Sequence, residues 1–193
     1  MGKSENTLQH TRLIFATNNP HKVREIQSAI GDQLAIISMK DAGIDIEIPE
    51  PHDSLRGNAL EKSRTIYLLS NGNDCFSEDT GLEVDDLHGE PGVKSARYAG
   101  EHVSFEKNID KLLTKLKDAT VRKAHFQTVI SLIFNDSEYF FEGVCDGQIL
   151  RKRQGTGGFG YDAVFMPNRS DKSFAEMSAK EKNQYSHRKK AAD

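Results

Sequence analysis

A long apolar hairpin in the second half of the chain most constrains its fold. Residues 124–134, A-H-F-Q-T-V-I-S-L-I-F, are rich in β-branched and aromatic side chains, which favours a strand over a helix. Asn135, Asp136 and Ser137 form a turn signal, and residues 138–147 return as the partner strand. The chain is therefore expected to contain a long antiparallel strand pair.

The residues before this hairpin alternate between strand-like and helix-like patterns. Strands are predicted over residues 12–17 and 34–38, and helices over 22–30, 55–69 and 102–117. Ser54 is expected to cap the second helix. The predicted apolar stripes are Leu55, Ala59, Ile66 and Leu69 on that helix, and Phe105, Ile109, Leu112, Leu113 and Leu116 on the third. Helices alternating with early strands, followed by a hairpin, predict an α/β fold with a mixed sheet.

Size and charge narrow the class of protein. With 193 residues, one domain over 12–193 is expected after a polar N-terminal extension over 1–11. The net charge of −3 argues against a nucleic-acid binder. No apolar run approaches the roughly 20 residues of a membrane helix, and the N-terminus lacks a secretory pattern. We therefore expect a cytoplasmic protein whose Cys75 and Cys145 are buried free thiols, although a disulfide is the alternative.

Two adjacent acids mark the first candidate site. Glu78 and Asp79 follow the apolar pair Cys75 and Phe76, and Thr80 and Gly81 come next. This order suggests a buried strand that ends by presenting acids at a turn. Carboxylates suit Mg²⁺, and a metal-bound water near a carboxylate base hydrolyses phosphate esters. The alternative is an acidic surface turn.

Two lysines in the N-terminal half of the chain, Lys22 and Lys62, are candidates for binding an anion. The segment T-N-N-P-H-K, residues 17–22, links a strand to a helix, and such a loop aims backbone N–H groups at a ligand. Lys62 lies on the apolar stripe of the helix over 55–69, which is unusual for a lysine. It either extends past the core edge to water or reaches an anion.

The segment G-T-G-G-F-G-Y-D, residues 155–162, matches neither a dinucleotide fingerprint nor a Walker loop. It predicts a flexible loop that displays Phe159, Tyr161 and Asp162, where an aromatic could stack on a purine. The alternative is a tight turn whose aromatic side chains fill the core.

The C-terminal segment is predicted to contain two short helices. Ser178 and Glu181 fit a capping box. A break at Tyr185 lets Ser186 cap a second helix, so that basic residues on both sides of the break can converge on one ligand. These residues are Lys182, His187 and Arg188. The alternative is a solvated basic tail.

Four blocks in this order resemble the inosine/xanthosine triphosphate pyrophosphatase family. They are F-A-T-N-N-P-H-K, S-E-D-T-G-L-E-V-D-D-L-H-G-E-P-G-V-K-S-A-R-Y-A-G, G-T-G-G-F-G-Y-D and F-A-E-M-S-A-K-E-K-N-Q-Y-S-H-R. The resemblance implies an elongated two-lobed α/β fold around a long twisted mixed sheet with a central cleft. It also implies a cytoplasmic homodimer that uses Mg²⁺ to cleave ITP, dITP or XTP between the α and β phosphates, which keeps such nucleotides out of DNA and RNA.

The same resemblance implies roles for individual residues. Asp79 is the general base and a metal ligand, with Glu50 as the matching acid and Glu78 as support for the metal. The residues expected to bind substrate are Thr17, Asn18, Asn19, Pro20, His21, Lys22, Lys62, Thr80, Phe159, Gly160, Tyr161, Asp162, Lys182, His187 and Arg188. Within this set Phe159 stacks on the base, and Arg188 donates to the 6-oxo group that distinguishes these purines from adenine.

Several positions depart from the family pattern. Glu78 stands where aspartate is common, Gly57 where glutamate is common, and Ala163 where proline is common. Only about two helical turns can follow Ser186, which is marginal for a helix. A related phosphatase with another base preference, and a nucleotide-sensing module without turnover, are the alternative functions.

Overall fold

A single mixed sheet organises the molecule. The computed structural model describes residues 12–31 and 34–193, so the expected extension over 1–11 lies outside the described residues. The sheet has seven strands in the order β2-β1-β3-β5-β6-β7, with β4 paired to β3. Their bounds are β1 Arg12–Phe15, β2 Ala35–Ser38, β3 Cys75–Val84, β4 Pro91–Gly92, β5 Lys123–Phe134, β6 Ser137–Ile149 and β7 Phe165–Pro167. The strands β1, β2 and β3 pair in parallel and the other pairs are antiparallel, which confirms the mixed sheet.

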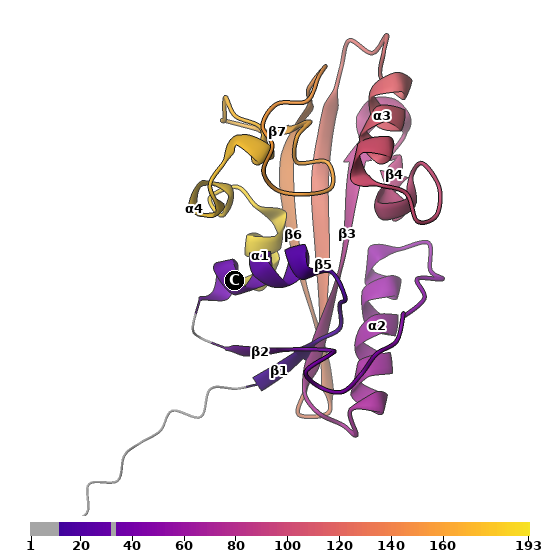
Figure 1. Ribbon diagram of the computed structural model, residues 1–193, viewed down its shortest axis with the longest axis vertical. Coiled ribbons are helices and arrows are strands. Elements are labelled where there is room, and N and C mark those ends of the chain that lie inside the picture. The colour runs from indigo at the N-terminus through magenta and orange to yellow at the C-terminus, as the bar shows by residue number, and fades with distance from the viewer. Residues whose placement is uncertain (1–11, 32–33) are drawn as a thin grey trace, which may run out of the picture.

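The predicted hairpin is confirmed as β5 and β6. Their register runs from Lys123 opposite Gln148 to Phe134 opposite Ser137. Asn135 and Asp136 form the turn with φ of 47° and 61°, the positive values that a two-residue hairpin turn with the sheet's own twist requires. The long axis of the elongated molecule follows these two strands (Figure 1).

The described residues contain five α-helices. They are α1 Pro20–Ile30, α2 Leu55–Leu69, α3 Phe105–Lys115, α4 Ala179–Lys182 and α5 His187–Ala192. Ser54 caps α2 by accepting from the Gly57 N–H, and Ser186 caps α5 by accepting from the Lys189 N–H, as predicted. In Figure 1, α2 runs beside β3 while α1 and α5, from opposite ends of the chain, lie together on the other side. Among the described residues, no helix is long and apolar enough to span a membrane.

Two predicted core positions were wrong. Leu69, on the expected stripe of α2, is 51% exposed, and Phe105, on the expected stripe of α3, is 37% exposed. The buried face of α2 instead includes Asn58, Lys62 and Ser63. Polar side chains on that face require polar partners inside the protein, because an unpaired buried polar group is costly.

Gly143 lets α5 lie directly on the sheet. A Cβ atom built at this position of β6 would lie 2.1 Å from the His187 carbonyl oxygen and 2.5 Å from the Ala191 nitrogen. Both are backbone atoms, so no side-chain rotation relieves the clash. The absence of a side chain at residue 143 therefore fixes the position of the helix that begins at His187.

We predict that Gly143→Ala lowers the free energy of unfolding by about 1–3 kcal/mol, because the added methyl group overpacks the contact between β6 and α5. Chemical denaturation measures this loss. Hydrogen exchange of the α5 amides should accelerate, since the helix has to shift. The neighbouring Val144→Ala, which trims a side chain that is 37% exposed, serves as the control. Equal α5 exchange in both variants would contradict the prediction.

Candidate active site

A cleft lies beside the point where β1 ends. Strand β1 pairs with β3 only as far as Phe15 opposite Phe76, and β4 pairs with β3 at Leu82 and Glu83. Between these pairings, one edge of β3 has no strand partner in the described part of the chain. Ligands of open α/β sheets bind at such divergence points.

The two acids lie in the middle of β3 and not at its end. The prediction of a strand that ends in a turn was wrong, because β3 continues through Gly81 to Val84. Alternation along the strand sends Glu78 and Asp79 to opposite faces. Asp79 thus meets α2, whereas Glu78 meets α1 and α5.

The cavity at this edge collects residues from all four predicted blocks. Its volume is about 110 Å³. The predicted residues that line it are Asn19, Lys22, Glu50, Asp79, Thr80, Phe159, Gly160, Tyr161, Asp162, His187 and Arg188. Segments separated by more than a hundred positions in the sequence therefore share one cavity.

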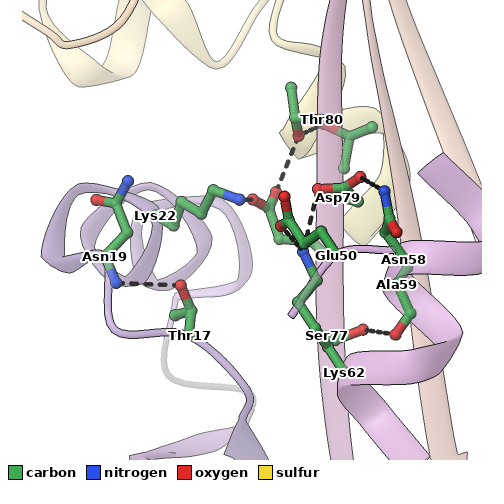
Figure 2. Close-up of polar contacts among 12 residues, drawn as sticks. Thr17, Asn19, Lys22, Glu50, Asn58, Ala59, Lys62, Ser77, Asp79 and Thr80 are labelled. Atoms are coloured by element: carbon green, nitrogen blue, oxygen red, sulfur yellow. Dashed lines mark hydrogen bonds and ion pairs between the residues drawn. The ribbon is translucent and has the colours of Figure 1, made fainter. Parts of the chain in front are cut away.

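Lys62 joins the two acids that were expected to work together. Its Nζ lies 2.7 Å from Glu50 Oε1 and 3.0 Å from Asp79 Oδ1 (Figure 2). The side chain is 7% exposed, so it does not extend to water, and the anions that it reaches are protein carboxylates. Burial alone would raise the pKa of Glu50, but Lys62, Lys22 and Arg97 outweigh it and lower the pKa to about 2. For Asp79, burial prevails over the nearby lysines and raises the pKa.

Asn58 holds Asp79 and the loop before α2 together. Its Oδ1 accepts from the His52 N–H at 2.9 Å, while its Nδ2 donates to the His52 carbonyl at 3.1 Å and to Asp79 Oδ2 at 3.4 Å (Figure 2 shows the contact with Asp79). The other end of the acid loop is held by Arg97, whose Nη1 lies 2.9 Å from Glu50 Oε2. Both acids are thus fixed from two sides.

A second set of ion pairs links the two ends of the chain. Glu78 Oε1 lies 2.8 Å from Lys22 Nζ and Glu78 Oε2 lies 2.6 Å from Arg188 Nε. Burial opposes ionisation of Glu78, but Arg188 and Lys22 lower its pKa well below the usual range. Glu25 pairs with Arg188 and also, at 2.6 Å, with Lys182. This network holds α5 against α1 and β3.

The two aromatics of the glycine-rich segment both line the cavity but differ in burial. Tyr161 is only 4% exposed, belongs to the core and donates to the Ser95 carbonyl. The expectation that both aromatics are displayed was therefore wrong for Tyr161. Asp162 accepts from the Phe159 N–H at 2.9 Å and pairs with Lys182 at 2.6 Å, which fixes the turn that carries Phe159.

The loop over residues 17–22 is organised by its own side chains. Thr17 Oγ1 accepts from the Asn19 N–H at 3.1 Å, as Figure 2 shows, and Asn19 caps α1 by accepting from the His21 N–H. Pro20 occupies the first helical position, where its missing N–H is harmless. Asn18 instead donates to the Ile46 carbonyl and so ties the loop to the segment before Glu50. These contacts place Lys22 at the cavity.

His187 is enclosed beside the cations. It is 2% exposed, and its Nδ1 lies 2.7 Å from Thr128 Oγ1, which also contacts Thr80. Burial, together with the charges of Arg188 and Lys182, lowers the pKa of His187 well below 6.5, with Glu78 opposing the shift. The basic C-terminal residues therefore form a buried wall and not a solvated tail, even though α5 is short.

Two of the three expected metal ligands fit a divalent cation. Glu50 and Asp79 line the cavity, and Mg²⁺ commonly binds one or two carboxylates together with substrate phosphates. Glu78 does not fit, because its side chain is fully buried between Lys22 and Arg188 and does not line the cavity. Within residues 12–31 and 34–193, no three His, Cys, Asp or Glu side chains form a metal-binding group.

Sequence reasoning missed three supporting residues, Glu25, Asn58 and Arg97. Glu25 gave no local signal, because its partners Lys182 and Arg188 are 157 and 163 positions away in the sequence. Asn58 carried a usable signal, since it lies one helical turn before Lys62 on the same buried face of α2. Arg97 belongs to the quoted S-A-R-Y segment, which gave no indication of its partner.

Comparison with known proteins places this geometry in context. The model of the Ham1 family matches residues 13–193. The chain is similar to a dITP/XTP pyrophosphatase of Flavobacterium psychrophilum, with 46% identity over 93% of this chain and 94% of the relative. It is 48% identical to a dITP/XTP pyrophosphatase of Porphyromonas gingivalis, over 92% of this chain and 91% of the relative. The solved structure of the Staphylococcus aureus Ham1 protein superposes with a TM-score of 0.82, at 37% identity and 94% coverage of both chains.

We predict that His187 makes folding stability fall as the pH drops below about 6.5. In that range the unfolded chain binds a proton at this histidine and the folded protein does not, so the free energy of unfolding falls by up to roughly 1.4 kcal/mol per pH unit. Urea denaturation between pH 7.5 and 5 measures the slope. His187→Asn should flatten it, whereas His102→Asn, at an exposed position, should not. An unchanged slope in His187→Asn would show that the residue is not held neutral.

Proposed function

The chain belongs to the Ham1 family, and we propose that it is a pyrophosphatase for ITP, dITP or XTP, purine nucleoside triphosphates that are not normal precursors of DNA and RNA. The products are the nucleoside monophosphate and pyrophosphate, so the bond between the α and β phosphates breaks. Removing these nucleotides prevents their incorporation into nucleic acid.

One observation carries this proposal: a single cavity combines a pair of carboxylates, cations from both ends of the chain and an aromatic ring. Acids alone would suit a cation, and cations alone would suit any anion. Their combination with Phe159 suits a ligand that has a polyphosphate at one end and a planar base at the other. The chemistry of the lining therefore agrees with the activity named for the relatives.

The polar end of the cavity suits the phosphates. A triphosphate carries about four negative charges, and Mg²⁺ ordinarily compensates part of them. Lys22 lines this end, and Lys62 lies behind the two acids. Glu50 and Asp79 are the residues that would hold Mg²⁺, which would supply charge compensation for the phosphates. We infer that the loop over 17–22 contributes mainly the Lys22 side chain, because the N–H groups of Asn19 and His21 already donate within the loop.

Asp79 is placed to act as the general base. Lys62 donates to Oδ1 and Asn58 to Oδ2, which fixes the carboxylate in one orientation. In the proposed reaction the oxygen of a water molecule bonds to phosphorus, the P–O bond between the α and β phosphates breaks, and Asp79 accepts the proton of the water. Pyrophosphate or the monophosphate leaves with the bonding electron pair, depending on the phosphorus attacked.

Arg188 is placed to select the base. Four of its five N–H groups have acceptors in Glu78, Glu25 and Thr80. The described part of the chain gives the remaining Nη1–H no acceptor. A 6-oxo group satisfies such a donor, whereas the 6-amino group of adenine opposes it, so adenine nucleotides should be rejected.

Three further properties are inferred from the family resemblance. Residues 12–193 form one catalytic domain, the enzyme works as a homodimer, and it acts in the cytoplasm. Size-exclusion chromatography with light scattering tests the dimer directly.

We predict that the protein with Mg²⁺ converts ITP to IMP and pyrophosphate and turns over ATP far more slowly. Chromatography of the nucleotides and a coupled pyrophosphate assay identify the products. Release of orthophosphate would indicate a different phosphatase, and ITP binding without turnover would indicate a sensing module. Equal kcat/KM for ITP and ATP would contradict the proposed role of Arg188.

We predict that Asp79→Asn lowers kcat for ITP by about 100-fold or more, because the variant keeps the shape of the side chain but loses the proton acceptor. Calorimetry should show nearly unchanged ITP binding. The exposed Asp118→Asn makes the same chemical change away from the cavity and should have the activity of the unchanged protein. Near-normal turnover by Asp79→Asn would mean that another group accepts the proton of the attacking water.

A further inference from the structure

Phe105 lies at the cavity although its position in the sequence predicts a core residue. It is the first residue of α3, and its ring is 37% exposed and lines the cavity. The other residues of the same stripe, Ile109 and Leu112, are 4% and 0% exposed. A large apolar side chain that turns from the core to a cleft suggests a ligand surface.

Phe105 belongs to a group of three rings from three separate elements. Its centroid lies 6.0 Å from that of Phe159, on the glycine-rich segment, and 6.2 Å from that of His21, on α1. His21 in turn stacks on Phe159, with 5.0 Å between centroids and an interplanar angle of 25°. We call His21, Phe105 and Phe159 the aromatic wall.

Two members of the aromatic wall, Phe105 and Phe159, line the cavity together with Glu50 and Asp79, and the two acids suit the Mg²⁺ that accompanies phosphates. The cations nearest to Phe159 are Lys182 and Arg188, at 5.5 and 5.6 Å from its ring centroid. A base with carbonyl groups would find both stacking surfaces and donors beside Phe159.

The contact between the rings leaves little space for a base. The cavity of about 110 Å³ is smaller than the ~300–1,000 Å³ typical of ligand pockets. We expect that a nucleotide entering the cavity separates Phe105 from Phe159, whose rings are now tilted by 56° against each other, and that the ring surfaces freed in this way contact the base.

We propose that Phe105 is a base-contacting residue whose ring forms a second aromatic surface for the purine beside Phe159. This inference rests on the proposed function, because it assumes that a nucleoside triphosphate occupies the cavity. Phe105 would then contribute to binding of the base and not to binding of the phosphates or to the chemical step.

The test compares a ligand that has a base with one that has none. ITP is the substrate and inorganic tripolyphosphate is the competitive inhibitor. In Phe105→Leu, which keeps an apolar side chain but removes the ring, KM for ITP should rise about fivefold, the scale of one aromatic contact. The kcat and the Ki of tripolyphosphate should stay unchanged. Phe105→Tyr keeps the ring and should retain the original KM.

Phe141→Leu is the matched control, because this phenylalanine on β6 is 44% exposed and does not line the cavity. The melting temperatures of all variants check folding. An equal rise in KM for ITP and Ki for tripolyphosphate in Phe105→Leu would overturn the proposal. It would indicate that Phe105 maintains the shape of the whole cleft and does not contact the base. An unchanged or lower KM would also overturn it, the lower value indicating that the ring only obstructs entry.

The experiment distinguishes a failure of the proposed pyrophosphatase activity from a failure of the proposal for Phe105. If the unchanged protein does not hydrolyse ITP, calorimetric dissociation constants for ITP and tripolyphosphate replace KM and Ki. A selective loss of ITP affinity in Phe105→Leu would then still support the base contact. Absence of ITP binding by the unchanged protein would overturn both proposals.

Discussion

Pairing of buried charges is the interaction on which the rest of this structure depends. Around the cavity, five carboxylates face five cations, namely Glu25, Glu50, Glu78, Asp79 and Asp162 with Lys22, Lys62, Arg97, Lys182 and Arg188. Removing charges from water costs several kcal/mol per ion, so each of them has to meet a partner in good geometry. The pairs connect the two ends of the chain to its middle, and the cleft exists only when all three segments are in place.

This pairing also explains how several cations can be stable inside the protein before an anionic ligand binds. Without the acids, the largely enclosed charges of Lys22, Lys182 and Arg188 would repel one another. Glu25, Glu78 and Asp162 neutralise them and fix their positions in advance. In the proposed function a nucleotide therefore meets cations whose side chains are already ordered, which would lower the entropic cost of binding.

The sequence was informative wherever a pattern is local. The hairpin turn, the caps at Ser54 and Ser186 and the break before α5 all depend on residues close in sequence, and all are confirmed. The strand β3 was misjudged at Gly81, which resembles a turn signal. Its hydrogen atom is in fact required because β4 passes so closely that a Cβ would lie 2.9 Å from the Gly92 carbonyl oxygen.

Contacts between residues far apart in the sequence explain the other differences between the predictions and the structure. Helical periodicity placed Phe105 in the core because it follows the spacing of Ile109 and Leu112, but at the first turn of α3 the same face extends past the core to the cleft. Periodicity likewise flagged Lys62 as unusual without naming its partners, since Glu50 comes from a loop and Asp79 from a strand on which neighbouring residues alternate in direction.

The shared lysine gives the two acids different tasks. Lys62 contacts both carboxylates, yet the pKa of Glu50 falls to about 2 while the pKa of Asp79 rises, because Glu50 gains Arg97 in addition and Asp79 is the more deeply buried. Glu50 therefore stays charged throughout the physiological range. The higher pKa agrees with our proposal that Asp79 is the general base, since a base is more effective as its pKa approaches the working pH. In the proposed function, surroundings that drive the two pKa values apart therefore assign the proton transfer to Asp79 and a constant negative charge to Glu50.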